Sequence, residues 1–472
     1  MKPLITRRSF LRRSLAASAA AVASPAPILP ALGAPAPANE IDVVIVGAGA
    51  AGIAAARRMA AAGRRFVLIE ATDHVGGRCV TDTKTFGVPF DRGAHRIHVP
   101  DLNPLIKVVP RGSVEIYPAP PGHRVRIGRR FAREGELEDF LSATVRTNRL
   151  IGEVSRKGDV AASQGLPRDL GEWRGAVEFM LGPYNCGKEL SEISAVDLAR
   201  MGERDTASYC RQGFGGLLAK LAEGVPVQLN TPVQAIDTGN RNNRVEVKTA
   251  RGTTVARFGI VTVSTEVLNA GKIRFESEQP RRQLDAAARL KLGSYDRIVL
   301  ELPGNPLGLQ RDELMFERAD GNRTAALRAN IGGSPLVFVD VAGKFGRELA
   351  AKGDQAMTDF AIEWLTGLFG TDIRKAVKRT AVTQWNADPW TLGAVSTASP
   401  GGQFMRRQLA EPMRDRLFFA GEATHETLWG TVGGAWESGE RAAEGVLRRL
   451  GVLKAPEEPR PQPQQRPQRR RS

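Results

Sequence analysis

The stretch between residues 41 and 70 constrains the fold of this chain more than any other. Its apolar, β-branched run Ile41–Val46 predicts a buried parallel strand. The run leads directly into the glycine-rich turn Gly47–Gly52 and an alanine-rich helix that ends near Ala62, and a second apolar strand follows at Phe66–Ile69. A strand, a G-x-G-x-x-G turn, a helix and a second strand predict a dinucleotide-binding βαβ unit, and hence an α/β fold with a Rossmann-type domain.

Each glycine of this turn has a separate expected role. Gly47 makes the tight turn, Gly49 lets a pyrophosphate approach the backbone, and Gly52 lets the helix pack closely on the strand. The phosphates would then lie against the free N–H groups at the helix N-terminus. An acidic residue after the second strand is placed to accept hydrogen bonds from ribose hydroxyls. The candidate cofactor-binding residues of this unit are Gly47, Gly49, Ala51, Gly52, Glu70 and Ala71.

Four further motifs follow in order along the chain. They are Val75–Arg78 and Phe90–His95 near the N-terminus, and Arg416–Thr424 and Gly430–Gly439 near the C-terminus. Together they resemble the flavin-containing amine oxidase family, which includes monoamine oxidases, polyamine oxidases, L-amino-acid oxidases and tryptophan 2-monooxygenases. The resemblance spans about residues 40 to 450. It implies FAD as the cofactor, because Rossmann proteins that use NAD lack the closing motif.

The resemblance also implies where FAD would lie. Arg78 would lie along the pyrophosphate, Val233 would hold the adenine through its backbone, and Glu422 would hold the ribityl or phosphate region. The last helix would point its positive end at the flavin and stabilise the anionic reduced form. Ala394 stands where monoamine oxidases bond FAD through cysteine, so the FAD is expected to be noncovalent. The residues implied in this way are Gly77, Arg78, Gly93, Ala94, Val233, Trp385, Gly421, Glu422, Thr431 and Val432.

We expect the FAD-binding domain to interleave with an α+β substrate domain, each being discontinuous in the sequence. The FAD-binding domain would comprise residues 40–100, 205–272 and 402–452, and the substrate domain residues 101–204 and 273–401. In the substrate domain, the run from 295 to 302 predicts a strand. Its residues Ile298, Leu300 and Leu302 would share one apolar face.

Three positions depart from the family pattern. Many amine oxidases frame the substrate nitrogen between two aromatic side chains, whereas the matching residues here are Val395 and Thr431. A lysine that usually holds a water at flavin N5 is replaced by Arg297. Arginine keeps its proton at working pH, so Arg297 is excluded as a base but is a candidate for ordering water or assisting oxygen. A solvent-facing arginine at a strand edge is the alternative.

Arg96 bears most directly on the substrate. The segment Gly93–Arg96 resembles the one in which L-amino-acid oxidases and tryptophan 2-monooxygenases place an arginine that binds the substrate carboxylate. A guanidinium group binds a carboxylate through two parallel hydrogen bonds, which both select and orient it. The alternative is a structural ion pair, with Asp91 as a candidate partner.

The resemblance implies an oxidase or dehydrogenase that oxidises a C–N bond of an amine or amino acid by hydride transfer to flavin N5. The flavin carries the reaction and the protein positions the C–H bond. The catalytic candidates are Arg96 and Arg297, and O₂ or a periplasmic electron acceptor would reoxidise the flavin. The alternatives are an enzyme of the tryptophan 2-monooxygenase or L-amino-acid oxidase type, an FAD-dependent desaturase, and an exported flavoprotein without catalytic activity.

Composition argues against two other classes. The net charge of +16 could suggest a nucleic-acid partner. However, five basic residues lie within the first 13 positions, and those in the body of the chain form no obvious stripe. The three cysteines and five histidines match no disulfide framework and no metal-ligand spacing. We therefore expect neither a nucleic acid nor a metal ion as a partner.

Both ends of the chain are expected to lie outside the folded body. The pair Arg7 and Arg8, followed by the apolar run Ser14–Ala23, is typical of a twin-arginine export signal, here residues 1–38. The apolar run is too short for a stable membrane span. We expect the twin-arginine machinery to export the folded protein to the periplasm or the medium. Residues 455–472, rich in proline, glutamine and arginine, are expected to be a disordered tail.

Overall fold

The computed structural model describes residues 40–201, 206–239 and 243–454. The expected export signal (residues 1–38) and the expected tail (residues 455–472) lie outside these residues, and both stay predictions. The strand and helix expected at the start of the body are confirmed almost to the residue. Strand β1 spans Ile41–Val46, helix α1 spans Ala50–Ala61, and strand β2 spans Phe66–Ile69.

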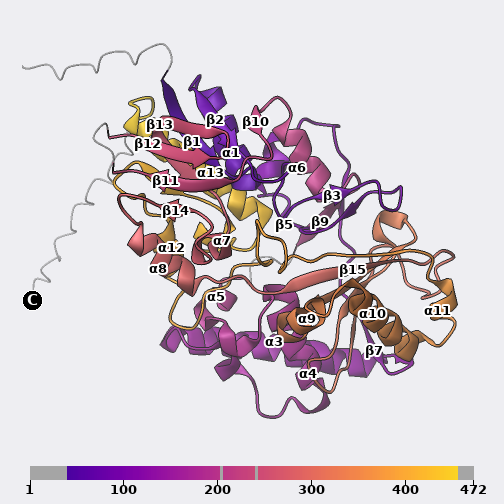
Figure 1. Ribbon diagram of the computed structural model, residues 1–472. Helices are drawn as coiled ribbons and strands as arrows, with labels where there is room; N and C mark the ends of the chain where they lie inside the picture. The colour runs from indigo at the N-terminus through magenta and orange to yellow at the C-terminus, as the bar shows by residue number, and fades with distance from the viewer. Residues whose placement is uncertain (1–39, 202–205, 240–242, 455–472) are drawn as a thin grey trace, which may run out of the picture. The chain divides into compact units, whose positions relative to one another are not determined.

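An eight-stranded sheet is built around this βαβ unit (Figure 1). Strands β10, β2, β1, β13 and β20 run parallel to one another, whereas β11, β12 and β13 form an antiparallel meander. The remaining strands of this sheet are β10 (Val227–Gln228), β11 (Val233–Asp237), β12 (Val245–Thr249), β13 (Gly252–Val261), β14 (Arg274–Phe275) and β20 (Leu417–Phe419).

Both faces of this sheet are buried, which explains why β1 is a continuous apolar run. Val43 and Ile45 pack with Met59 of α1 and with the last helix, α13 (Val432–Arg449). Their neighbours along the strand, Val44 and Val46, face the opposite core. The first and last helices of the body therefore lie together on one face of the sheet (Figure 1).

A second, seven-stranded sheet is mostly antiparallel, in the order β19-β15-β18-β17-β16-β7-β8. The strand expected from residue 295 is β15, and Ile298, Leu300 and Leu302 do share one core. They pack there with residues of helices α9 and α10. The strands of this sheet are β7 (Arg124–Ile127), β8 (Arg130–Phe131), β15 (Tyr295–Glu301), β16 (Leu314–Glu317), β17 (Ala326–Arg328), β18 (Leu336–Ala342) and β19 (Thr380–Val382).

The remaining strands and helices lie outside the two large sheets. The other strands are β3 (Thr81–Asp82), β4 (Phe90–Asp91), β5 (Ile97–His98), β6 (Ile116–Pro118) and β9 (Ala207–Cys210). The other α-helices are α2 (Pro104–Val108), α3 (Glu134–Lys157), α4 (Arg174–Phe179), α5 (Ala195–Ala199), α6 (Phe214–Ala222), α7 (Thr265–Asn269), α8 (Arg281–Arg289), α9 (Gly343–Ala350), α10 (Asp354–Phe369), α11 (Ile373–Ala376) and α12 (Met405–Ala410). A π-helical turn, η3, spans Met180–Tyr184, and 3₁₀ turns span Ala162–Gly165, Gly171–Trp173, Leu190–Glu192, Ile331–Gly333 and Glu422–Thr424.

The predicted α/β fold with a Rossmann-type part is confirmed. The strands of the first sheet come mainly from the ranges assigned to FAD binding, and those of the second from the ranges assigned to the substrate domain. The described residues nevertheless group as one compact unit, so the exact domain boundaries stay a prediction. Within the described part of the chain, no helix is both long and apolar enough to cross a membrane.

Candidate active site

A cavity of about 1010 Å³ connects the ends of the first sheet with one face of the second. Nearly all the residues singled out in the sequence line it, although they come from segments far apart in the chain. Those that line it are Gly47, Gly49, Ala51, Glu70, Ala71, Gly77, Arg78, Gly93, Ala94, Arg96, Val233, Arg297, Trp385, Gly421, Glu422, Thr431 and Val432. Gly52 lies just behind the cavity wall.

The glycine-rich turn has a shape that only glycine permits. Gly47 has a φ of +101°, in the left-handed region. A Cβ on Gly52 would lie 1.8 Å from the carbonyl oxygen of Gly47, so the helix could not pack against the turn with any larger residue. Gly49 differs, because a Cβ there would have only the Gly76 carbonyl oxygen nearby, at 4.0 Å. The space above Gly49 is therefore open to a ligand.

Helix α1 begins beside this open space. Its N-cap is Gly49, no side chain caps its first turn, and no acidic residue lies in that turn. The first N–H groups of a helix have no partner within the helix and carry partial positive charge. This end of α1 is therefore suited to an anionic group such as a pyrophosphate.

Glu70 fixes the other side of the turn. One carboxylate oxygen accepts a hydrogen bond from the Ala48 N–H at 2.7 Å, and the other accepts bonds from the N–H and the hydroxyl of Thr72, both at 2.9 Å. A carboxylate oxygen has more than one acceptor site. The same group can therefore hold the turn and still accept a bond from a ribose hydroxyl in the cavity.

Glu422 is the centre of a buried polar network. It accepts hydrogen bonds from Arg78 at 3.0 Å, from the N–H and hydroxyl of Ser396, and from the Gly430 N–H at 2.8 Å. Burial alone would raise the pKa of this carboxyl, but the guanidinium groups of Arg78 and Arg406 and these hydrogen bonds hold the pKa below its usual value. Glu422 is therefore a carboxylate that orders the cavity wall.

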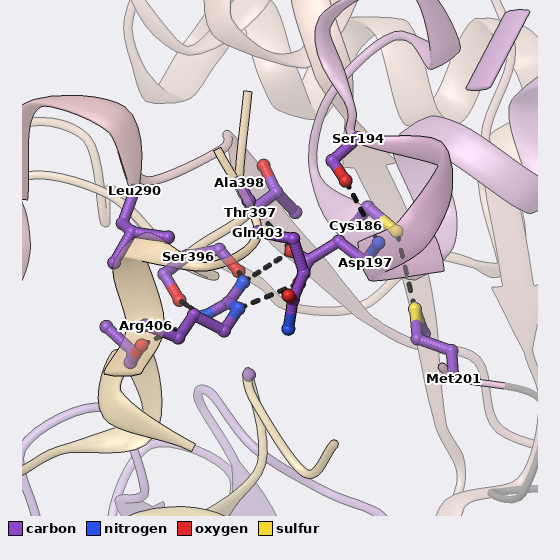
Figure 2. Close-up of polar contacts among 12 residues, drawn as sticks. Cys186, Ser194, Asp197, Met201, Leu290, Ser396, Thr397, Ala398, Gln403 and Arg406 are labelled. Carbon is purple, nitrogen blue, oxygen red and sulfur yellow. Dashed lines mark hydrogen bonds and ion pairs between the residues drawn. The ribbon is translucent and has the colours of Figure 1, made fainter. Parts of the chain in front are cut away.

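The network continues away from the cavity through Arg406 (Figure 2). This fully buried guanidinium group binds both carboxylate oxygens of Asp197, at 2.8 and 2.6 Å, and donates to the Ser396 hydroxyl at 3.1 Å. Asp197 also accepts a bond from the Ala398 N–H. Helices α5 and α12 thus anchor the segment 396–398, which directly follows the cavity-lining residues Ala394 and Val395.

A second helix begins at the cavity. Thr431 is the N-cap of α13, and its hydroxyl accepts a hydrogen bond from the Gly434 N–H at 3.0 Å. No acidic residue lies in the first turn of α13. The positive ends of α1 and α13 therefore both face the same cavity.

These features fit FAD. The cavity is large enough for an extended ligand, its open turn and α1 suit a pyrophosphate, Glu70 suits a ribose, and α13 suits an electron-rich ring edge. Trp385 lines the same cavity, with its ring against Gly93 and its indole N–H donating to the Arg92 carbonyl. Val395 and Thr431 also line it, so neither position that the family uses for an aromatic pair carries an aromatic ring.

Arg297 does not face solvent, and that alternative is wrong. The side chain is only 5% exposed. Strand register places Arg297 directly opposite Asp340 on β18, and the two form a two-point ion pair with an Nε–Oδ1 distance of 2.8 Å. Its Nη1 donates to the carbonyl oxygens of Asp91 and Gly93. Arg297 thereby holds in place the backbone segment that lines the cavity.

Tyr295 adds a further hydrogen bond to the Arg297–Asp340 ion pair. Its hydroxyl donates to Asp340 at 2.7 Å, and burial together with the neighbouring carboxylate raises its pKa well above the usual value. Both carboxylate oxygens of Asp340 are thus occupied. The pair is electrically neutral, so it adds no net charge to the cavity.

Arg96 lies in the cavity wall without a counter-ion. Its guanidinium carbon lies 5.3 Å from the centre of the Tyr184 ring, and it makes no hydrogen bond or ion pair with any described residue. The suggested pair with Asp91 is not formed. The Asp91 carboxylate instead accepts hydrogen bonds from Thr81, His95 and the N–H groups of Phe214 and Gly215.

Two residues of the cavity wall could not be identified from the sequence motifs. Tyr184 ends the π-helical turn η3, and Arg328 lies on β17, and both line the cavity. Tyr184 belongs to no motif that would have marked it. Arg328 did leave a signal, since it is a lone charge in the apolar run Ala325–Ala329. A charged residue in a buried strand requires a partner, and that partner can be a ligand.

Metal and disulfide chemistry find no support in the described part of the chain. No group of three or more potential metal ligands is present there. The three cysteines are buried, and none of them forms a disulfide bond within the described residues.

Comparison with known proteins agrees with the geometry. A family model described as flavin containing amine oxidoreductase matches residues 50–447. The chain is 26% identical over 453 residues to polyamine oxidase 3 of Oryza sativa subsp. japonica, covering 87% of this chain and 90% of that protein. It is 28% identical over 448 residues to lysine-specific histone demethylase 2 of Homo sapiens, covering 86% of this chain and 53% of that protein.

Solved structures share the fold at lower identity. Cyclohexylamine oxidase from Brevibacterium oxydans IH-35A superposes with a TM-score of 0.73 at 19% identity, over 87% of this chain and 100% of that one. Putrescine oxidase bound to putrescine gives a TM-score of 0.73 at 20% identity, over 87% of this chain and 99% of that one.

Proposed function

Because this chain belongs to the flavin-containing amine oxidoreductase family, we propose that it oxidises the C–N bond of an α-amino acid, using Arg96 to bind the carboxylate. The chain is an oxidoreductase, and its cofactor is noncovalent FAD. Membership of the family supports oxidation of an amine. The proposed carboxylate on the substrate depends on Arg96.

The unpaired guanidinium group of Arg96 is the main support for this proposal. An arginine stays charged at any working pH, and this one lines the cavity without a hydrogen bond or ion pair from any described residue. Its N–H groups are therefore available to a ligand. A carboxylate can accept two of them in parallel, which places the neighbouring α-carbon in a fixed orientation.

When bound, FAD supplies a two-electron acceptor at N5. Removal of the α-hydrogen as a hydride and loss of a proton from the nitrogen would give an imine, and water would hydrolyse that imine to an oxo acid and ammonia. O₂ or another electron acceptor would be needed to accept the two electrons.

The protein's own residues orient the substrate and keep the site in shape. Arg96 would hold the carboxylate, while Trp385 and Thr431 line the neighbouring wall. Arg297 acts as a positioning residue, because its guanidinium group donates hydrogen bonds to Asp340 and to the backbone of Asp91 and Gly93. It orients the wall and does not act as a base.

The test compares an amino acid with its decarboxylated amine by following anaerobic bleaching of the visible flavin band. We expect the amino acid to reduce the flavin much faster. Losing a charge-assisted hydrogen bond costs about 1.5–3 kcal/mol, or about 10- to 150-fold in affinity. Arg96→Met should remove the preference and leave amine turnover largely unchanged. Arg96→Lys should recover only part of it, because a point charge cannot form the two-point contact.

Arg92→Met is the matched control, since Arg92 lines the outer part of the same cavity and is half exposed. It should leave the preference unchanged. Equal losses on amine and amino acid in Arg96→Met would show that Arg96 is structural and would leave a simple amine oxidase. Bleaching by apolar polyenes alone would indicate a desaturase, and no bleaching by any compound would indicate a flavoprotein without catalytic activity.

We further propose that the protein acts outside the cytoplasm, in the periplasm or the medium. The support is the arginine pair Arg7 and Arg8 and the apolar run that follows it. In that compartment O₂ or a periplasmic electron carrier would serve as the acceptor.

A further inference from the structure

Arg328 lines the same cavity as Arg96. On β17, Leu327 faces the core formed with helices α9 and α10. Side chains alternate along a strand, so Arg328 points to the opposite face, toward the cavity. It is 6% exposed and lines the cavity.

All the contacts of Arg328 are to uncharged groups. Nη1 donates to the Asp312 carbonyl oxygen at 3.1 Å, and Nη2 donates to the Tyr184 hydroxyl at 3.2 Å. The guanidinium carbon lies 5.2 Å from the centre of the Tyr209 ring. Within the described residues, Arg328 therefore forms no ion pair.

The nearby carboxylates are occupied by other groups. Asp340 binds Arg297 with both oxygens and accepts a further bond from Tyr295. The Asp312 carboxylate binds the Tyr117 hydroxyl, Arg311 and the Gly332 N–H. Neither carboxylate neutralises Arg328 by direct contact.

The two unpaired guanidinium groups both contact Tyr184. Arg96 lies over the ring of Tyr184, and Arg328 donates to the hydroxyl of the same tyrosine. Since the Arg297–Asp340 pair is neutral, Arg96 and Arg328 are two positive charges beside Tyr184 that no described carboxylate pairs with. Arg328 is buried, and a buried charge without a counter-ion costs much free energy that an anionic ligand removes.

We propose that Arg96 and Arg328 together bind a substrate with two carboxylates, an acidic α-amino acid. This inference rests on the proposed function and assigns the second carboxylate to Arg328. A neutral amino acid would leave Arg328 buried with uncharged partners only. A diamine would bring an ammonium group toward two cations, so this chain should oxidise diamines poorly.

The first experiment uses non-reactive ligands and the holoenzyme. Glutarate and butyrate are titrated separately, and binding is read from the shift of the flavin absorbance. We expect glutarate to bind at least about tenfold more tightly than butyrate, as one additional charge-assisted contact predicts. In Arg328→Gln this preference should disappear while butyrate binding stays at the wild-type level.

Arg311→Gln is the matched control. Arg311 lies over the Tyr117 ring and pairs with the Asp312 carboxylate, close to Arg328 but outside the cavity wall. It should keep the preference for glutarate. If Arg328→Gln fails to fold, Arg328→Lys takes its place, and the comparison of glutarate with butyrate on the wild-type protein still decides the question.

The second experiment separates this inference from the function on which it rests. Glutamate, aspartate, glutamine, norvaline and putrescine are compared as reductants of the flavin under anaerobic conditions. Faster reduction by the two acidic amino acids supports the inference. Equal reduction by glutamate, glutamine and norvaline, with equal binding of glutarate and butyrate, overturns it and leaves the amino-acid oxidase intact. Reduction by putrescine alone overturns both.

Discussion

At the scale of single residues, one buried carboxyl holds the segment that carries Trp385. Asp296 on β15 accepts hydrogen bonds from the Thr383 hydroxyl at 3.0 Å and the Trp385 N–H at 2.8 Å through one oxygen, and from Asn386 at 2.9 Å through the other. Burial raises its pKa to about 6, although these hydrogen bonds act in the opposite direction. The wall next to Trp385 therefore contains a group that titrates near neutral pH.

This titration makes the stability of the protein depend on pH in a defined direction. Since the pKa of Asp296 in the fold (about 6) lies above its ordinary value of 3.8, the folded protein binds the proton more tightly than the unfolded chain. The resulting stability is present below the ordinary value and is lost as pH rises through about 6. Relative to Asp296→Asn, wild type should lose on the order of 3 kcal/mol of unfolding free energy across this range.

Urea unfolding at a series of pH values measures this difference. Asp320→Asn is the matched control, because Asp320 is exposed, and this variant should keep the pH dependence of the wild type since it retains Asp296. A difference between wild type and Asp296→Asn that stays constant with pH would contradict the expected titration.

At the scale of elements, the packing of α1 against α13 joins the two ends of the cofactor site. A Cβ on Gly439 of α13 would lie 2.0 Å from the Ala51 carbonyl oxygen of α1. Backbone atoms cannot move aside as a flexible side chain can. The two helices can therefore place their first turns at one cavity only because Gly439 has no side chain.

Gly439→Ala should separate these helices. Overpacking of this kind costs about 1–3 kcal/mol, and we expect a lower thermal midpoint together with less FAD per chain, measured from the ratio of flavin to protein absorbance. Gly367→Ala on α10 is the matched control. Its Cβ would meet nothing within 4 Å, so the better helix propensity of alanine should stabilise the fold by about 0.5–1 kcal/mol. Unchanged FAD content in Gly439→Ala would contradict the role assigned to this contact.

Some elements of the fold could be predicted from the sequence, and others could not. Strands β1, β2 and β15 were predictable because each is a local apolar run with its own periodicity. The glycine turn was predictable because its steric requirements are local. The burial of Arg297 was not, since it depends on which strand lies beside β15 and in which register. Tyr184 and Arg328 were missed for the same reason, because only tertiary packing brings η3 next to β17.

At the scale of the whole molecule, the presence of noncovalent FAD has a direct test. The purified protein should be yellow, and denaturation should release free FAD into the supernatant, because Ala394 offers no thiol for a covalent bond. Absorbance of the supernatant after precipitation measures the release. Flavin that remains on the precipitated protein would contradict noncovalent binding.

Gly49→Val tests the position assigned to the cofactor. The added side chain would enter the open space above the turn and would meet little of the protein itself. We expect a colourless protein, since the side chain would occupy the path of the pyrophosphate.

Export is also a property of the whole chain. Changing Arg7 and Arg8 together to lysine should retain the protein in the cytoplasm, because the export machinery reads the arginine pair. Fractionation of cells followed by immunoblotting measures the distribution. Unchanged amounts of the double variant outside the cytoplasm would refute the proposed location.

The pairing of α1 with α13 also sets an order of events on the ribosome. The turn that receives the pyrophosphate is made near the start of the body, whereas the helix that completes the cavity begins at Val432. At about 5–20 residues per second, roughly 20–80 seconds of synthesis separate the two. Throughout that interval α1 lacks the partner that covers it, and the nascent chain has no finished pocket to load. Cofactor insertion must therefore wait until nearly the whole polypeptide has emerged. A chain that stops before α13 would leave the ribosome with apolar surface exposed and without bound FAD.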